Sequence, residues 1–290
     1  MAKSESGLLV PVIIMGLLML VVELIALFLG APLDAAGIRA FEDPDSPANS
    51  LYYIGFILLF TLFILLIIKW DKKWMIQLMI FGAIISTIYY VLCPLFVKFF
   101  PLNTSIVLSV SIAVILALIL YVFPEWYIID FVGLIVGAGA AAIFGISLSI
   151  VPVLVLLVLL AVYDAIAVYQ TKHMVALAEG VMDLRLPILF IVPKHRGYSF
   201  REETFDKEER DAFFMGLGDA VIPSVLVVSA YFFTGSLTIA VFAIIGSLIG
   251  FAVLMRLVLK GNPQAGLPFL NTGVIIGYVI GALVVGIPVI

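Results

Sequence analysis

The feature that most constrains this chain is a series of apolar segments, each about 20 residues long, separated by polar connections. A helix rises 1.5 Å per residue, so about 20 apolar residues cross the hydrocarbon core of a bilayer. Nine segments qualify, at 8–29, 51–68, 74–97, 105–123, 126–148, 151–171, 213–233, 237–259 and 267–289. We therefore predict an all-α, polytopic, integral membrane protein with nine transmembrane helices.

The composition supports lipid as the main solvent of the chain and excludes several other classes. Hydrophobic residues make up 64% of it and charged residues only 12%, which is far from the balance of a soluble domain. Lys and Arg lie at segment ends and in one mixed-charge connection, so the basic surface that nucleic acid requires is missing. The single cysteine, Cys93, allows neither an intrachain disulfide nor a cysteine-based metal cluster. We expect no nucleic-acid partner, no metal and no cofactor.

The basic residues also predict orientation, because short cytoplasmic connections carry an excess of Lys and Arg. With the N-terminus in the cytoplasm, only Arg39 and Lys98 of the 15 basic residues fall on the outer side, and the C-terminus lies outside. We predict one domain over 1–290, with spans one to six in 1–171, a cytoplasmic connection in 172–211 and spans seven to nine in 212–290. In a prokaryote it would lie in the cell membrane. Within the connection, 174–182 is expected to form a short interfacial helix and the charged remainder a solvated linker.

Small residues recur at four-residue spacing within several predicted spans. This spacing lets helix backbones approach closely in lipid, so we interpret these glycines as packing residues. They are Gly133 and Gly137, Gly246 and Gly250, and Gly273, Gly277 and Gly281.

Four carboxyl side chains fall inside predicted spans, where an unpaired charge costs several kcal/mol. Asp130 is close enough to a span end to reach the interface. For Glu23, a hydrogen-bonded packing role and a functional role both remain open. Asp164 and Asp219 differ because they match in depth: Asp164 precedes Lys172 by eight residues, and Asp219 follows Asp211 by eight. Helical geometry places both about 12 Å below the same edge of the membrane.

Two carboxyls at one depth on consecutive antiparallel spans can share a proton, because both cannot ionise cheaply side by side. The ionised partner can take a proton from an attacking water while the protonated partner donates to a carbonyl oxygen, which is the chemistry of aspartyl proteolysis. Gly216 and Gly218, just before Asp219, would allow another backbone to approach. Tyr163 could hydrogen-bond in such a site or point toward the interface.

Three motifs stand out: Tyr163-Asp164 in span six, Gly216-Leu217-Gly218-Asp219 in span seven, and Ala265-Gly266-Leu267-Pro268 before span nine. Together with the nine-span layout, they resemble the presenilin and signal peptide peptidase family of intramembrane aspartyl proteases. The chain is most similar to a microbial, archaeal presenilin homologue. One motif departs from the family pattern, since the family's Pro-Ala-Leu before the last span is matched only as Ala-Gly-Leu.

The resemblance implies an intramembrane aspartic endopeptidase that cleaves transmembrane helical substrates with Asp164 and Asp219. The remaining motif residues, Tyr163, Gly216, Leu217, Gly218, Ala265, Gly266, Leu267 and Pro268, would support the site or position substrate. The expected partners are transmembrane proteins or peptides and the bilayer, without a requirement for accessory subunits, and a homo-oligomer stays open. Substrate could add as a strand to backbone near 184–192 or 266–267.

Other activities of membrane proteins require different residues. A zinc protease or a rhomboid-like serine protease needs a histidine within a span, but His173 and His195 both fall in the connection. The alternative that stays open on the residues alone is a proton- or cation-coupled transporter or channel, in which buried aspartates bind ions. A noncatalytic membrane scaffold would leave the matched acids unexplained.

Overall fold

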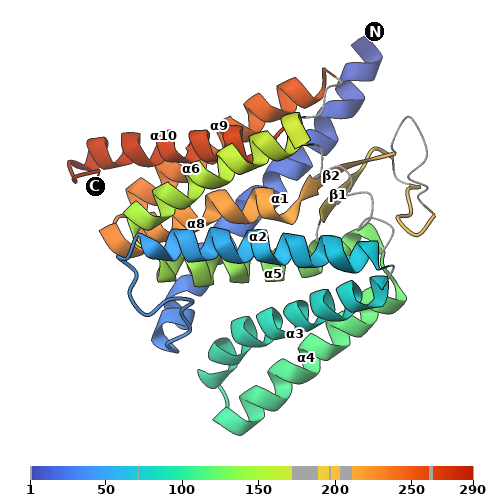
Figure 1. Ribbon diagram of the computed structural model, residues 1–290, viewed down its shortest axis with the longest axis horizontal. Helices are drawn as coiled ribbons and strands as arrows, with labels where there is room; N and C mark the ends of the chain where they lie inside the picture. Colours follow the sequence, from blue (N-terminus) through green and yellow to red (C-terminus); the bar gives the residue numbers. More distant parts are fainter. Residues whose placement is uncertain are drawn as a thin grey trace.

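The computed structural model describes residues 2–70, 72–171, 189–195, 197–202, 211–260 and 264–289. Within these residues, nine helices are long and apolar enough to cross a membrane, so the predicted nine-span helical fold is confirmed. The elements (Figure 1) are α1 (Ala2–Ala35), α2 (Ala48–Lys69), α3 (Lys73–Val97), α4 (Leu102–Val122), α5 (Trp126–Ser147), α6 (Ile150–Ile166), the π-helix η1 (Ala167–Thr171), β1 (Leu189–Pro193), β2 (Ala212–Gly216), α8 (Leu217–Thr234), α9 (Leu237–Val258) and α10 (Leu267–Val285).

Several predicted spans have different boundaries in the structure. The first was expected to end at residue 29, but α1 continues to Ala35. The seventh was expected to begin at residue 213, but its helix begins at Leu217 because 212–216 form a strand. The ninth was expected to reach 289, but α10 ends at Val285. There Gly286 adopts a left-handed φ of 78°, a conformation that glycine reaches without steric cost and that ends many helices.

A small antiparallel sheet is the element that the sequence reading did not predict. Leu189 pairs with Gly216 at one end of it and Pro193 with Ala212 at the other. Both strands are rich in aromatic or β-branched residues, which suit a half-buried pleated surface. Phe190 is fully buried. The expectation of a solvated linker throughout the connection is therefore wrong for this part of it.

Other predictions for the same connection fall outside the described residues. The short interfacial helix at 174–182 lies within 172–188, and most of the charged run lies within 203–210. Both remain predictions.

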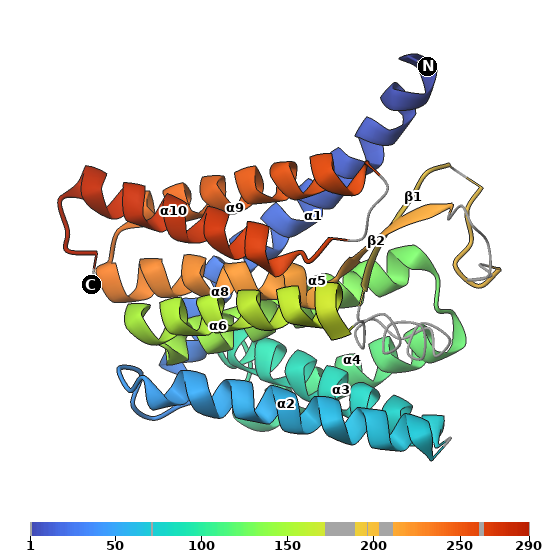
Figure 2. The ribbon, with the colours of Figure 1, turned by 45° about the horizontal axis from the view of Figure 1, so that its top comes forward.

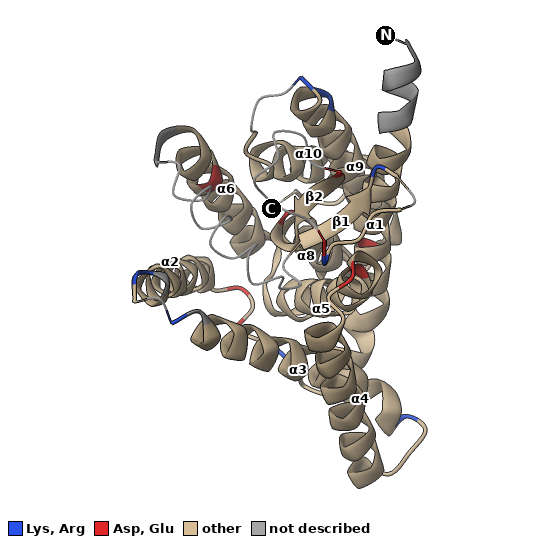
Figure 3. Ribbon diagram, turned by 90° about the vertical axis from the view of Figure 1, so that its right-hand side faces the viewer, with Lys and Arg blue, Asp and Glu red and all other residues tan. Residues whose placement is uncertain are grey.

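The helix α8 lies at the centre of the molecule and contacts α1, α5, α6, α9 and α10 (Figure 2). It is the span with the largest buried share, whereas α2 has the smallest. Large apolar side chains such as Phe28, Leu59 and Leu78 are exposed on the outside, as expected for a surface that faces lipid. Figure 3 looks onto the end that carries the strands and shows few charged residues among the spans.

The contact between α9 and α10 depends on glycine. A Cβ atom added at Gly246 would lie 2.2 Å from the Gly273 carbonyl oxygen and 2.9 Å from the Gly277 Cα. A Cβ at Gly273 would lie 2.3 Å from the Gly246 oxygen. The backbones thus touch directly, which confirms the packing interpretation for these positions.

Replacing Gly246 by Ala is expected to destabilise the protein, because the added methyl overlaps the α10 backbone, which cannot yield as a side chain can. Overpacking of this kind costs about 1–3 kcal/mol. The measurement is the thermal unfolding midpoint in detergent, which should fall by several degrees. Gly82→Ala in α3 is the matched control, since its Cβ would meet no atom within 4 Å. Equal midpoints for the two variants would contradict the packing account.

Candidate active site

Asp164 lies in the last turn of α6 and is 6% exposed. Its Oδ2 accepts a hydrogen bond from the Leu267 N–H at 3.0 Å, and the Gly266 amide also interacts with the same carboxyl. Directly after it the chain enters η1, a π-helix of five residues. Such π turns are rare and frequently occur at functional sites. The carboxyl is therefore held by backbone from the start of α10.

Asp219 lies in the first turn of α8, directly after β2. It was expected well inside a helix, and the helix-based depth of about 12 Å does not apply to it, because five of the preceding residues are extended and rise about 3.3 Å each. Its carboxyl interacts with the Gly216 amide and is half-buried. A helix N-terminus favours a negative charge at this position.

The segment from Gln264 to Leu267 contacts both acids. A Cβ added at Gly266 would lie 3.1 Å from the Asp219 Cγ, so this backbone rests directly on the Asp219 carboxyl. The next residue, Leu267, donates its N–H to Asp164. The two carboxyls are also within electrostatic reach of one another. The end of α6, the start of α8 and the start of α10 converge beside β2 (Figure 2).

The other motif residues divide into those beside the carboxyls and those that pack elsewhere. Gly218 is exposed, and a Cβ there would meet no atom within 4 Å, so open space adjoins Asp219. Leu217 instead points to α5, where its Cδ1 lies 3.1 Å from the Cβ position of Gly137. Ala265 is fully buried, and Pro268 lies in the first turn of α10, where its fixed φ suits a helix start. Tyr163 is half-buried beside Asp164 on α6.

Two side chains that the sequence reading did not single out position the segment before α10. The Tyr169 hydroxyl donates to Gln264 Oε1 at 2.9 Å and accepts the Ala265 N–H at 3.3 Å. Asn271 donates from Nδ2 to the Leu157 carbonyl of α6 at 2.8 Å. A signal was available for Asn271, because a fully apolar span seldom carries an amide without a partner. Tyr169 resembled an ordinary interfacial tyrosine.

The other two intramembrane acids do not join this site. Glu23 of α1 is fully buried and accepts a hydrogen bond from the Ser247 hydroxyl of α9, which fits a packing role. Asp130 of α5 does not extend to the interface as expected. It is 7% exposed, and its Oδ1 accepts the Ile191 N–H of β1 at 2.8 Å.

No group of three or more His, Cys, Asp or Glu side chains that could hold a metal occurs within the described residues. His195 is near Asp211, with 3.8 Å between Nε2 and Oδ1, and both are well exposed. The site that the structure does assemble consists of two carboxyls, backbone amides and adjoining open space. Chemically, this arrangement can bind a carbonyl group and activate water.

Comparison with known proteins gives a consistent result. The family model described as "Signal-peptide peptidase, presenilin aspartyl protease" matches residues 15–287. Two solved structures of a presenilin family intramembrane aspartate protease are similar to the chain. One is 42% identical over 93% of this chain and 96% of its own, with a TM-score of 0.72. The other is 38% identical over 94% and 98%, with a TM-score of 0.70. No curated protein matches.

Replacing Tyr169 by Phe is expected to loosen the segment before α10, because both hydrogen bonds of the hydroxyl are lost. Hydrogen bonds of this kind contribute about 0.5–1.5 kcal/mol, so local amide exchange should accelerate roughly 2- to 10-fold. The measurement is hydrogen–deuterium exchange of a peptide covering 264–270. Tyr52→Phe, on the exposed face of α2, is the control. Unchanged exchange in Tyr169→Phe would show that the hydroxyl does not hold this segment.

Proposed function

The chain belongs to the family of signal peptide peptidases and presenilin aspartyl proteases, and from that premise we propose that Asp164 and Asp219 are its catalytic pair. The protein is an intramembrane aspartic endopeptidase, which sets aside the transporter alternative. The observation that carries the residue assignment is the shared contact with Gly266–Leu267. One short backbone segment touches both carboxyls, so the two acids face one space.

The proposed reaction uses one proton shared by the two acids. The ionised carboxylate accepts a proton from water as the water oxygen attacks the scissile carbonyl carbon, and the protonated partner donates to the carbonyl oxygen. As the tetrahedral intermediate breaks down, the departing nitrogen takes the proton that came from water, and the other carboxylate takes back the proton of a hydroxyl group of the intermediate. The products are a carboxylic acid and an amine, and the pair again holds one proton.

Peptide hydrolysis at this site needs water and an extended substrate, because a helical carbonyl is blocked by its own hydrogen bond. The space beside Gly218 and the half-buried state of Asp219 support access of water and substrate to the acids. A substrate segment is proposed to add as a strand to β2, which leads through Gly216 to Asp219. The other strand, β1, is held on its far side by Asp130.

The family acts on transmembrane substrates within the membrane. We propose that this chain does so without accessory subunits, because both acids and the segment between them come from one chain. The site takes residues from both sides of the 172–211 connection, since α6 precedes it and α8 and α10 follow it. This supports one domain over 1–290. The excess of basic residues at the aspartate end supports a cytoplasmic location for that end.

Replacing either acid by the isosteric amide is expected to abolish cleavage, since neither Asp164→Asn nor Asp219→Asn can share the proton. Loss of general acid–base chemistry alone costs about 10²–10⁴-fold in rate. The measurement is cleavage of a helical transmembrane substrate by purified protein in liposomes. Glu42→Gln, exposed in the first connection, is the control. Cleavage near the parental rate by either variant would remove the assignment.

Replacing Gly266 by Ala is expected to lower kcat by roughly three- to tenfold, because the new Cβ lies 3.1 Å from Asp219 Oδ1 and must displace the carboxyl by a few tenths of an ångström. The family's Pro-Ala-Leu motif carries alanine at this position. The variant therefore also tests whether the backbone of this chain lies closer to the acid than the backbone of relatives that carry alanine. A parental or higher kcat would show that the close approach has no consequence for catalysis. Gly82→Ala serves as control.

A further inference from the structure

We propose that Asp130 of α5 is a positioning residue for Asp219, acting through the β1–β2 sheet. The inference rests on the proposed function, because it assigns Asp130 a part in placing a catalytic acid. Asp130 touches neither carboxyl of the pair. Its role would be to hold the strand against which the chain leading to Asp219 is aligned.

The contact itself is buried on both sides. Asp130 Oδ1 lies 2.8 Å from the Ile191 nitrogen, and the two residues are 7% and 0% exposed. A carboxyl is costly in such surroundings, so a packing role alone would favour an apolar side chain at this position. Loss of the acceptor would leave the Ile191 N–H buried without a partner, which destabilises the strand.

The direction of this hydrogen bond shows which edge of the sheet it serves. In an antiparallel pair, a residue points both backbone groups either toward its partner strand or away from it. The Ile191 N–H points to α5, so it lies on the edge of β1 that faces away from β2. Asp130 therefore holds the outer edge of β1, while the inner edge pairs with β2.

Because β1 pairs with β2 and β2 leads directly into α8, the position of β1 also determines the position of Asp219. Leu189 pairs with Gly216, the last residue of β2, and α8 begins at the next residue. Asp219 is the third residue of that helix and contacts the Gly216 amide. No flexible linker separates the strand from the acid, so a displacement of β1 carries over to the carboxyl.

Further contacts from the same helix support the assignment. A Cβ at Gly133 would lie 3.2 Å from the Phe190 ring, and one at Gly137 would lie 3.1 Å from Leu217 Cδ1. Positions 130, 133 and 137 share one face of α5, since they are spaced by three and four residues. This face thus carries β1 and the first residue of α8 together.

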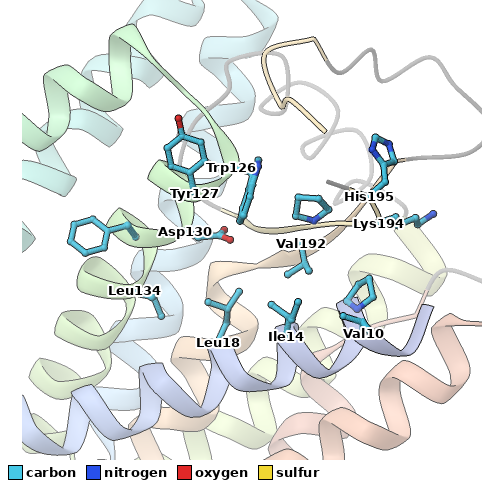
Figure 4. Close-up of a pocket in the computed structure, with 13 residues that line it drawn as sticks. Val10, Ile14, Leu18, Trp126, Tyr127, Asp130, Leu134, Val192, Lys194 and His195 are labelled. Carbon is cyan, nitrogen blue, oxygen red and sulfur yellow. The ribbon is translucent and has the colours of Figure 1, made fainter. Parts of the chain in front are cut away.

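The α1 side of the cavity beside Asp130 offers no side chain that could replace it as an acceptor. Asp130 lines a cavity of about 550 Å³ between α1, α5 and residues 192–195 (Figure 4). The α1 wall of this cavity consists of Val10, Pro11, Ile14 and Leu18. None of these side chains can accept a hydrogen bond. Elsewhere in the lining Tyr127 and His195 carry side-chain acceptors, but the Ile191 N–H donates to Asp130.

The test compares Asp130→Asn, which keeps an acceptor oxygen, with Asp130→Leu, which has the same branched shape, a larger volume and no acceptor. Cleavage of a transmembrane substrate in liposomes gives kcat and KM. Asp130→Leu should lose about 10- to 100-fold in kcat with KM within threefold, because the acid is misplaced while most substrate contacts persist. Asp130→Asn should stay within about threefold of the parent. Parental kcat in Asp130→Leu, or an equal loss in Asp130→Asn, would overturn the proposal.

A second measurement separates this proposal from the catalytic assignment. In an Asp219→Asn background, where cleavage plays no part, hydrogen–deuterium exchange at 189–193 should be faster with Asp130→Leu than with Asp130→Asn. Equal exchange would overturn the anchoring role, whereas retained cleavage by Asp219→Asn itself would overturn only the catalytic assignment. If Asp130→Leu does not fold, Asp130→Ala takes its place, since it removes the acceptor without added volume. Failure of both to fold would show a general structural role and would also overturn the proposal.

Discussion

The structure depends on one constraint, which is that backbone amides placed among apolar helices must find hydrogen-bond acceptors within the protein. Two non-helical pieces of chain lie there, β1–β2 and the segment before α10. In each, a carboxylate from a neighbouring helix accepts a backbone N–H: Asp130 from Ile191, and Asp164 from Leu267. A protease must offer non-helical backbone near its catalytic acids, because the N–H and C=O groups of a helix are already hydrogen-bonded and cannot pair with an extended substrate. The acids thus stabilise the same irregular segments that the reaction requires.

The convergence of three chain segments on one site follows from how the helices pack. Asp164 ends α6, Asp219 begins α8, and Gly266–Leu267 begins α10. Asn271 ties α10 to α6 through the Leu157 carbonyl, and glycines bring α9 against α10 without intervening side chains. Both contacts lie within a few helical turns of Asp164 and Asp219. The site is consequently built from helix ends rather than from helix middles, and its open space is left by Gly218.

The sequence predicted the nine spans because their hydropathy is strong, and it indicated Asp164 and Asp219 because charge is so costly inside spans. It did not predict the strands, since Leu-Phe-Ile-Val and Ala-Phe-Phe-Met are as apolar as the helices around them and pairing is a long-range property. For the same reason the depth argument, which assumed helix beside both acids, does not apply to Asp219. The role of Asp130 was also out of reach, because its partner is a backbone amide 61 residues away. For Glu23, the sequence could not supply the hydrogen bond from Ser247, which lies 224 residues away.

The glycine contact between α9 and α10 also bears on the position of the backbone beside the acids. Because the Gly246 and Gly273 carbonyls each lie against the opposing backbone, neither helix can rotate about its axis without a clash. The two helices therefore form one rigid unit, and Leu267 lies at the end of it. Because Leu267 donates its N–H to Asp164, the rigid contact between α9 and α10 also fixes where the backbone beside the acids lies.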